Sequence, residues 1–201
     1  FEVMNRLSVE VTAKNVPSVR DPLGGAGVLA VLIEFETAHA EGLRDAIESA
    51  LAAAMEVGEA ETALIAENSS QARDFLALRE MISAGHKPEG AQVSHDVSVP
   101  VSATPAFLSK ANAAMEARCP GVRIVAFGHM GDGNFHYTAM QPQGADPTTF
   151  PGPALTEIVY EIATAFGGSI SAEHGIGIAR RADLARFKDR ESLALMRAVK
   201  H

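Results

Sequence analysis

The feature that most constrains the fold is a glycine-rich reversal between two β-type segments. Residues 122–127 are mostly β-branched and apolar, and residues 134–140 alternate between polar and apolar side chains, so both are predicted strands. Between them, Asp132-Gly133 is a strong signal for a tight turn. We therefore predict a hairpin whose second strand carries Asn134 and His136 on one face.

The remaining segments alternate between strand and helix patterns. Predicted strands are 28–36, 62–66 and 93–99, and the length and apolar character of 28–36 suit a central strand. Predicted helices are 40–55, 69–84, 104–115 and 155–166. Residues 1–27 are rich in turn signals and are expected to be mostly loop. The order β-α-β-α-β-α-β-β-α predicts an α+β fold, a ferredoxin-like antiparallel sheet covered by helices, with a helical C-terminal part.

Composition narrows the class of protein. The chain has 201 residues, 47% of them apolar, which is ample for a core. Its 17 basic against 25 acidic residues give a charge of -8, which disfavours nucleic acid as a partner. No apolar run approaches the ~20 residues of a membrane span, and no signal peptide opens the chain. We expect a cytoplasmic location, with peripheral membrane association through an electron acceptor as the alternative.

The organisation of the chain is expected to be one domain over 1–201, with substructure 1–100 and 101–201. Phe1 is not an initiator methionine, and a helical pattern still runs when the chain stops at His201, so we expect a fragment. Cys119 is the single cysteine, which excludes an intrachain disulfide and a thiolate cluster. Any metal would be held by histidine and carboxylate.

Two short segments carry the residues best suited to chemistry. The hairpin should bring His129 close to His136, and residues 169–177 supply Glu173 beside His174 in a glycine-punctuated loop. Two imidazoles and one carboxylate form a site for zinc, manganese or ferrous iron, and His174 remains available as a base. The alternative is that these histidines are structural, since a histidine near a turn is more often that than a ligand.

Arg79 is the other residue that stands out. On the helix predicted for 69–84 it shares the inward, apolar side with Ser83. A guanidinium in such a place needs an anion. Either a core carboxylate such as Asp96 or an acidic substrate would serve, and the sequence leaves both open.

GHMGDGNFH (128–136) and SAEHGIG (171–177) resemble the paired signatures of the FAD-linked oxidase C-terminal domain family. LREMIS (78–83), HDVSVP (95–100) and VLIEFE (31–36) extend the resemblance over most of the chain. The family includes D-lactate, D-2-hydroxyglutarate and glycolate dehydrogenases of the vanillyl-alcohol-oxidase class. It implies that a separate N-terminal domain binds FAD, while this domain covers the flavin and contributes substrate ligands.

For individual residues, the resemblance implies a divalent metal, zinc or manganese, on His129, His136 and Glu173. His174 would take the hydroxyl proton of a 2-hydroxyacid while hydride moves from its carbon to FAD, giving the 2-oxoacid. This chemistry suits a flavin assisted by a metal ion. The resemblance also allows a homodimer and leaves the electron acceptor unidentified.

The resemblance further implies that Arg79 binds the substrate carboxylate, with Ser83 nearby. Asn134 would lie near both flavin and substrate, Glu173 would lie near the flavin, and His174 would contact the substrate. One departure is Ser94, because some dicarboxylate-acting members have lysine there, which weakens a 2-hydroxyglutarate assignment. Because the flavin-domain glycine loop is absent, we do not expect this chain alone to turn over a substrate.

Two other readings remain open from the residues alone. The first is a metal-dependent hydrolase or lyase that uses the same His/His/Glu ligands with a bound water and needs no flavin. The second is a noncatalytic ferredoxin-like module with structural histidines, which needs no metal.

Overall fold

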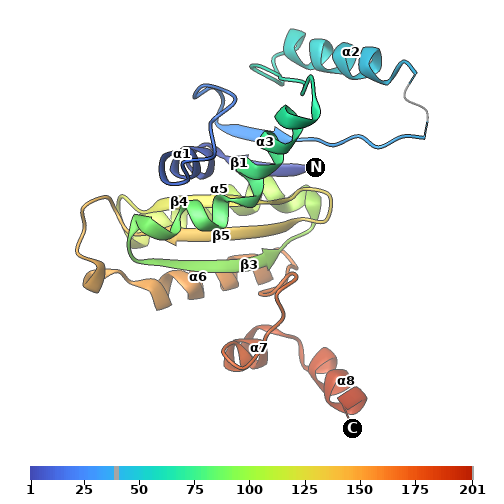
Figure 1. Ribbon diagram of the computed structural model, residues 1–201. Coiled ribbons are helices and arrows are strands. Elements are labelled where there is room, and N and C mark those ends of the chain that lie inside the picture. The colour runs from blue at the N-terminus through green and yellow to red at the C-terminus, as the bar shows by residue number, and fades with distance from the viewer. Residues whose placement is uncertain (39–40, 201) are drawn as a thin grey trace. The chain divides into compact units, whose positions relative to one another are not determined.

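The computed structural model describes residues 1–38 and 41–200 (Figure 1). The chain divides into two compact units, Phe1–Glu89 and Gly90–His201, whereas the sequence suggested a division at residue 100. The predicted start of a helix at Ala40 and the terminal His201 lie outside the described residues. Within the described ranges, no helix combines the length and hydropathy that a membrane span requires.

The first unit contains a two-stranded antiparallel ladder and several helices. Its elements are β1 (Glu2–Asn5), α1 (Arg6–Asn15), β2 (Leu29–Leu32), α2 (Leu43–Glu56), α3 (Ser69–Glu80), α4 (Ile82–Gly85) and the short 3-10 helix η1 (Lys87–Glu89). In the ladder, Val3 lies opposite Val31. The Asn5 side chain accepts the Ser8 N–H at 3.1 Å and so caps α1, which begins directly after β1.

Several predictions for this unit were wrong. Residues 1–27, described as rich in loops with no predicted helix or strand, contain both β1 and α1. The strand predicted for 28–36 is the four-residue β2, and Leu29 and Val31 are 50% and 54% exposed, so β2 is not a central strand. Residues 62–66 form no strand. The single helix predicted for 69–84 is interrupted at Met81, where α3 ends and α4 begins.

The second unit carries a three-stranded antiparallel sheet with β5 between β4 and β3. Its elements are β3 (Gln92–Ser98), η2 (Val101–Ala103), α5 (Thr104–Arg118), β4 (Arg123–His129), β5 (Asn134–Met140), η3 (Pro147–Thr149), α6 (Gly152–Ala165), α7 (Arg181–Phe187) and α8 (Arg190–Lys200). The predicted hairpin is confirmed, and so is the α+β class with antiparallel strands. A bridge from Ser169 to Ser98 lies on the free side of β3, where a ferredoxin-like fold would place its last strand.

The two faces of this sheet differ in character. Helices α5 and α6 cover one face (Figure 1). On this face the ring centroids of Phe107 and Tyr137 are 6.0 Å apart, and those of Tyr160 and His95 are 5.7 Å apart. The largest side chains of this core are Phe107, Met115, Phe135, Tyr137, Leu155 and Val159. The opposite face carries the polar residues described below.

Glycine is required on both sides of the hairpin turn. A Cβ at Gly133 would lie 2.0 Å from the Val99 carbonyl oxygen, and the φ of Gly133 is +72°. A Cβ at Gly128 would lie 2.1 Å from the Asn134 carbonyl oxygen. The two glycines therefore allow close backbone approach, of Gly133 to Val99 and of Gly128 to Asn134.

Candidate functional site

The register of the sheet places polar residues from three strands next to one another. Because directly paired residues share a face, Phe127, His136 and Asp96 form one row across β4, β5 and β3. His129, Asn134 and Ser98 form the adjacent row at the hairpin end. As the alternation predicted, Asn134, His136 and Thr138 share this face.

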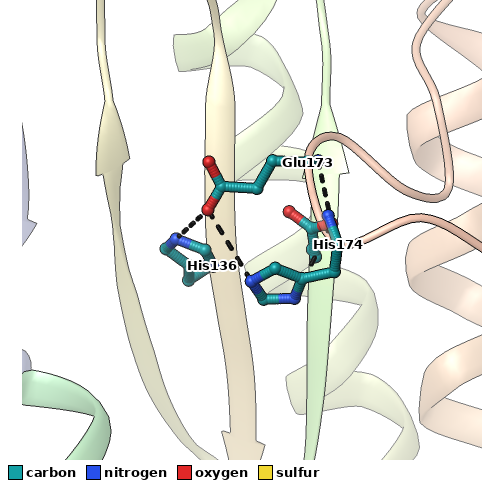
Figure 2. Close-up of side chains that lie close together, drawn as sticks. His136, Glu173 and His174 are labelled. Atoms are coloured by element: carbon teal, nitrogen blue, oxygen red, sulfur yellow. Dashed lines mark hydrogen bonds and ion pairs between the residues drawn. The ribbon is translucent and has the colours of Figure 1, made fainter.

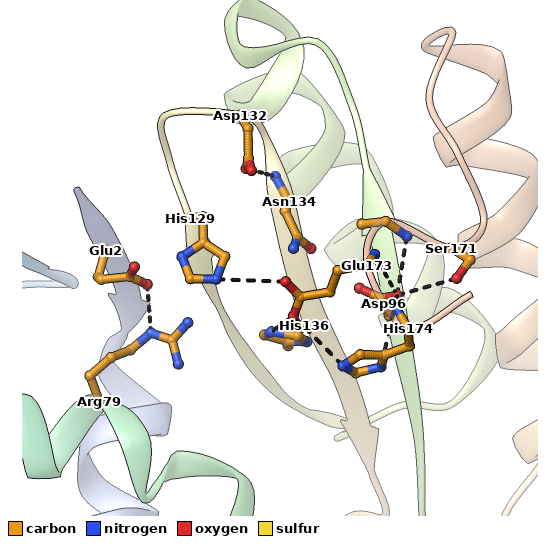
Figure 3. Close-up of polar contacts among 11 residues, drawn as sticks. Glu2, Arg79, Asp96, His129, Asp132, Asn134, His136, Ser171, Glu173 and His174 are labelled. Carbon is orange, nitrogen blue, oxygen red and sulfur yellow. Dashed lines mark hydrogen bonds and ion pairs between the residues drawn. The ribbon is translucent and has the colours of Figure 1, made fainter.

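A loop after α6 approaches the same face from the β3 side. Ser98 N–H donates to Ser169 O at 3.1 Å, and Ser169 N–H donates to Ser98 O at 2.9 Å. Three residues after Ser169, Ala172 N–H donates to the backbone O of Asp96, two residues before Ser98, at 3.0 Å. These backbone bonds bring Glu173 and His174 to the polar face (Figure 3).

The Glu173 carboxylate lies beside both histidines of the hairpin. Its Oε1 is 3.2 Å from His136 Nε2, and its Oε2 is 3.9 Å from His129 Nε2 (Figures 2 and 3). The centroids of the two imidazole rings are 6.5 Å apart. The structure thus brings together the three residues that the sequence suggested as metal ligands.

His174 lies against the same group. Its ring stacks on His136 with centroids 5.3 Å apart, and its Nε2 is 3.7 Å from Glu173 Oε1. Its Nδ1 is 3.8 Å from Asp96 Oδ2. With 58% of its side chain exposed, His174 can meet a molecule that enters from solvent.

Asp96 is the site residue that sequence reasoning missed. Its Oδ2 accepts the N–H groups of Ala172, Glu173 and His174 at 3.1, 3.1 and 2.8 Å, and the Ser171 hydroxyl at 3.3 Å. Burial raises the pKa of Asp96, but these N–H donors and the nearby imidazoles outweigh burial and hold the pKa below its usual value.

Asp96, His136, Glu173 and His174 each offer a ligand atom within 4.8 Å of the others. Two sets of metal ligands are therefore conceivable on this face. Asp96 Oδ2 is already surrounded by hydrogen-bond donors, whereas the Glu173 carboxylate faces the imidazoles of His129 and His136. His136 and Glu173 belong both to this group and to the ligand set that the sequence suggested.

Asn134 lies in the row of His129. It is buried, and its backbone N–H donates to Asp132 Oδ1 at 3.0 Å, which closes the hairpin turn. Its side-chain oxygen is buried without a hydrogen-bond partner among the described residues. An amide that is oriented in this way is available to a bound molecule.

Arg79 and Ser83 belong to the first unit. On α3, Arg79 Nε pairs with Glu2 Oε2 at 2.7 Å, so a carboxylate of the same unit faces its guanidinium. Ser83 is exposed, which contradicts the prediction that it lies on the inward side with Arg79. The physical reason is the break at Met81, which shifts the helical register before α4.

Known proteins are similar to this chain over most of its length. Residues 1–201 match the family described as FAD linked oxidases, C-terminal domain. A D-2-hydroxyglutarate dehydrogenase of Xanthomonas citri pv. viticola is 35% identical over 176 residues, which are 85% of this chain and 36% of that protein. One of Stutzerimonas stutzeri is 33% identical, over 84% of this chain and 36% of that protein. A D-lactate dehydrogenase of Anaerostipes hadrus is 31% identical, over 85% of this chain and 36% of that protein.

An antiparallel α+β unit with two imidazoles and a carboxylate at the hairpin end of one sheet face defines the class of site. The match over the whole chain then identifies the family: the chain belongs to the FAD-linked oxidase C-terminal domains. It spans about a third of the length of the curated relatives it matches.

Proposed function

We propose that this chain is the substrate-binding and metal-binding domain of an FAD-dependent 2-hydroxyacid dehydrogenase. The observation that carries the proposal is the Glu173 carboxylate facing His129 and His136, with His174 beside it. The names of the relatives, D-2-hydroxyglutarate and D-lactate dehydrogenase, support the reaction. An N-terminal domain of the same protein would bind FAD. The family match favours this chemistry over that of a hydrolase or a noncatalytic module.

The donor set fits a divalent metal ion. Two imidazole nitrogens and a carboxylate oxygen are ligands that zinc and manganese accept, and three protein ligands leave positions for a substrate. The side chains of His129 and Glu173 are 39% and 45% exposed, so the group is open on one side. A bound ion would orient a 2-hydroxyacid and lower the pKa of its hydroxyl.

The side chains of this face would then carry out the proton chemistry. His174 Nε2 would take the hydroxyl proton, and the hydrogen on the same carbon would leave as hydride for FAD, so that the hydroxyl carbon becomes a carbonyl. By the resemblance to the family, Asn134 would contact substrate and flavin, and Glu173 would lie near the flavin. The same resemblance assigns the substrate carboxylate to the guanidinium of Arg79, with Ser83 as a further polar contact.

The residues near this face bear on substrate choice. Next to the row of His136, the Thr138 hydroxyl donates to Ser94 Oγ at 2.9 Å, so this position holds a neutral hydroxyl pair. A second carboxylate on the substrate would find no cation in that pair. We therefore propose a D-lactate type substrate ahead of a D-2-hydroxyglutarate type, while both remain to be assayed.

The test uses the protein at its full natural length with FAD bound. Elemental analysis after dialysis should find near-stoichiometric zinc or manganese in the wild type and none in His129→Ala/His136→Ala. His86→Gln, which alters a histidine of the other unit, should retain the metal. Anaerobic mixing with D-lactate or D-2-hydroxyglutarate should bleach the flavin in the wild type. A wild type without metal, or a flavin that neither acid reduces, would contradict the proposal.

A further inference from the structure

We propose that Asp96 is a positioning residue of the site: its buried carboxylate holds the segment 171–174 against β3 and thereby places Glu173 and His174. The role in catalysis rests on the function proposed above. Asp96 touches neither substrate nor flavin in this scheme, and it acts through the two residues whose backbone it holds.

The hydrogen bonds of Asp96 show how the segment is held. Three consecutive backbone N–H groups, those of Ala172, Glu173 and His174, converge on the single atom Oδ2, and the Ser171 hydroxyl adds a fourth donor. Successive N–H groups that point to one place form a concave site for an anion. Bonds to an ionised acceptor are about twice as strong as neutral ones. A negative charge is therefore what this backbone turn requires.

The other backbone bonds of the segment among the described residues end at Ala172: Ser169 Oγ donates to Ser171 O at 2.8 Å, and Ala172 N–H also donates to Asp96 O at 3.0 Å. The side chains of Glu173 and His174 are 45% and 58% exposed, so core packing does not orient them. The chain continues into Gly175 and Gly177, whose positive φ values of +72° and +55° turn it away, and a Cβ at either would meet no atom within 4 Å. Beyond Ala172, the carboxylate of Asp96 is thus what the backbone N–H groups of Glu173 and His174 bind before this glycine turn.

Asp96 also lies beside the His174 ring. Nδ1 faces Asp96 Oδ2 at 3.8 Å, and Nε2 faces Glu173 Oε1 at 3.7 Å. At these distances the carboxylate of Asp96 acts on His174 through the backbone N–H that it holds at 2.8 Å. The second oxygen, Oδ1, is buried with no hydrogen-bond partner among the described residues, a costly arrangement for a residue that served packing alone.

The test compares Asp96→Asn with Asp146→Asn in the full-length FAD-bound protein. Asp146 is a matched control, because its carboxylate also accepts a backbone N–H, that of Thr148 at 2.9 Å, but on an exposed turn. In Asp96→Asn, amide hydrogen exchange should be at least about tenfold faster in peptides covering 169–177 and unchanged in those from β4 and β5. Cobalt(II) affinity, followed by visible absorption, should fall about 10- to 100-fold.

Flavin reduction provides the readout that a purely structural role would not change. In Asp96→Asn at saturating cobalt and substrate, the reduction rate should stay at least about tenfold below wild type because His174 is misplaced, and KM should change less than kcat. Asp146→Asn should equal the wild type in all three measurements. Exchange and affinity equal to wild type would overturn the proposal, and so would faster exchange spread evenly over the second unit.

Ser171→Ala keeps the proposal testable if Asp96→Asn does not fold. It removes one donor to Asp96 Oδ2 and leaves the buried carboxylate in place. Exchange should again be faster only in peptides covering 169–177, by a smaller factor, and unchanged exchange there would count against Asp96. These exchange results do not depend on turnover, so they stand even if no 2-hydroxyacid reduces the flavin of the wild type, a result that would defeat the proposed function alone.

Discussion

Mild acid should destabilise the second unit through one buried histidine, His95. On β3, His95 Nδ1 lies 2.8 Å from Tyr137 O and Nε2 lies 3.0 Å from Thr156 Oγ1. A carbonyl only accepts, so Nδ1 carries the proton and Nε2 accepts from the threonine hydroxyl. The pKa of His95 is lowered from 6.5 to about 4: burial is the main cause, the hydrogen bond to Tyr137 opposes it, and the charge of Arg180 adds to it.

The sign follows from proton binding. The unfolded chain protonates this histidine below pH 6.5, whereas the folded unit resists protonation until about pH 4. Stability from the neutral ring is therefore complete above pH 6.5 and is lost as the pH falls from 6.5 towards 4. At about 1.4 kcal/mol per pH unit, the loss reaches about 3 kcal/mol near pH 4.

The assay is denaturation by guanidinium chloride, followed by far-UV circular dichroism, for wild type and His95→Gln. Between pH 7 and pH 4.5, the free energy of unfolding of the wild type should fall by about 2 kcal/mol more than that of the variant. The titration of carboxylates contributes equally to the pH dependence of unfolding in both proteins, so it cancels when the two are compared. An equal pH dependence in the two proteins would refute the claim that His95 is held neutral.

Two further predictions concern the site and its turn. His174→Ala in the complete enzyme should retain its metal, as measured by elemental analysis. Its flavin reduction, followed by stopped-flow absorbance, should slow by about 100-fold or more, because a general base contributes about that much. Normal reduction would remove His174 from the mechanism. In denaturant titrations, Gly133→Ala should lower the free energy of unfolding by about 2 kcal/mol or more, because its Cβ would lie 2.0 Å from Val99 O at a φ of +72°. Gly131→Ala, with open space around it, should change the free energy of unfolding far less. Equal effects of the two substitutions would contradict this account of the turn.

Local patterns in the sequence were enough for the elements that depend on neighbours along the chain. The hairpin of β4 and β5 was predictable because alternation and Asp132-Gly133 act within about twenty residues. Helix α6 was predictable because its apolar residues recur at helical spacing and are buried on one side. The hairpin in turn implied that His129 and His136 lie close together.

Weaker local signals failed. The four residues of β1 are too few for a period, and they run directly into α1, so the region resembled loop. The apolar run at 28–36 suggested a central strand, yet burial depends on what packs against a strand and not on its composition. Ser83 was placed inward because one continuous helix was assumed, and the break at Met81 removed that register.

By itself, the sequence determined the hairpin, the α+β class, the family and the chemical types gathered at the site. Only the tertiary structure decided how they meet: β3 pairs with β5 in a register that sets Asp96 beside His136, and the bridge at Ser98 brings Glu173 to the imidazoles. The physical reason is distance along the chain. Pairings between segments separated by about forty or more residues depend on the packing of everything between them, and no local pattern records that.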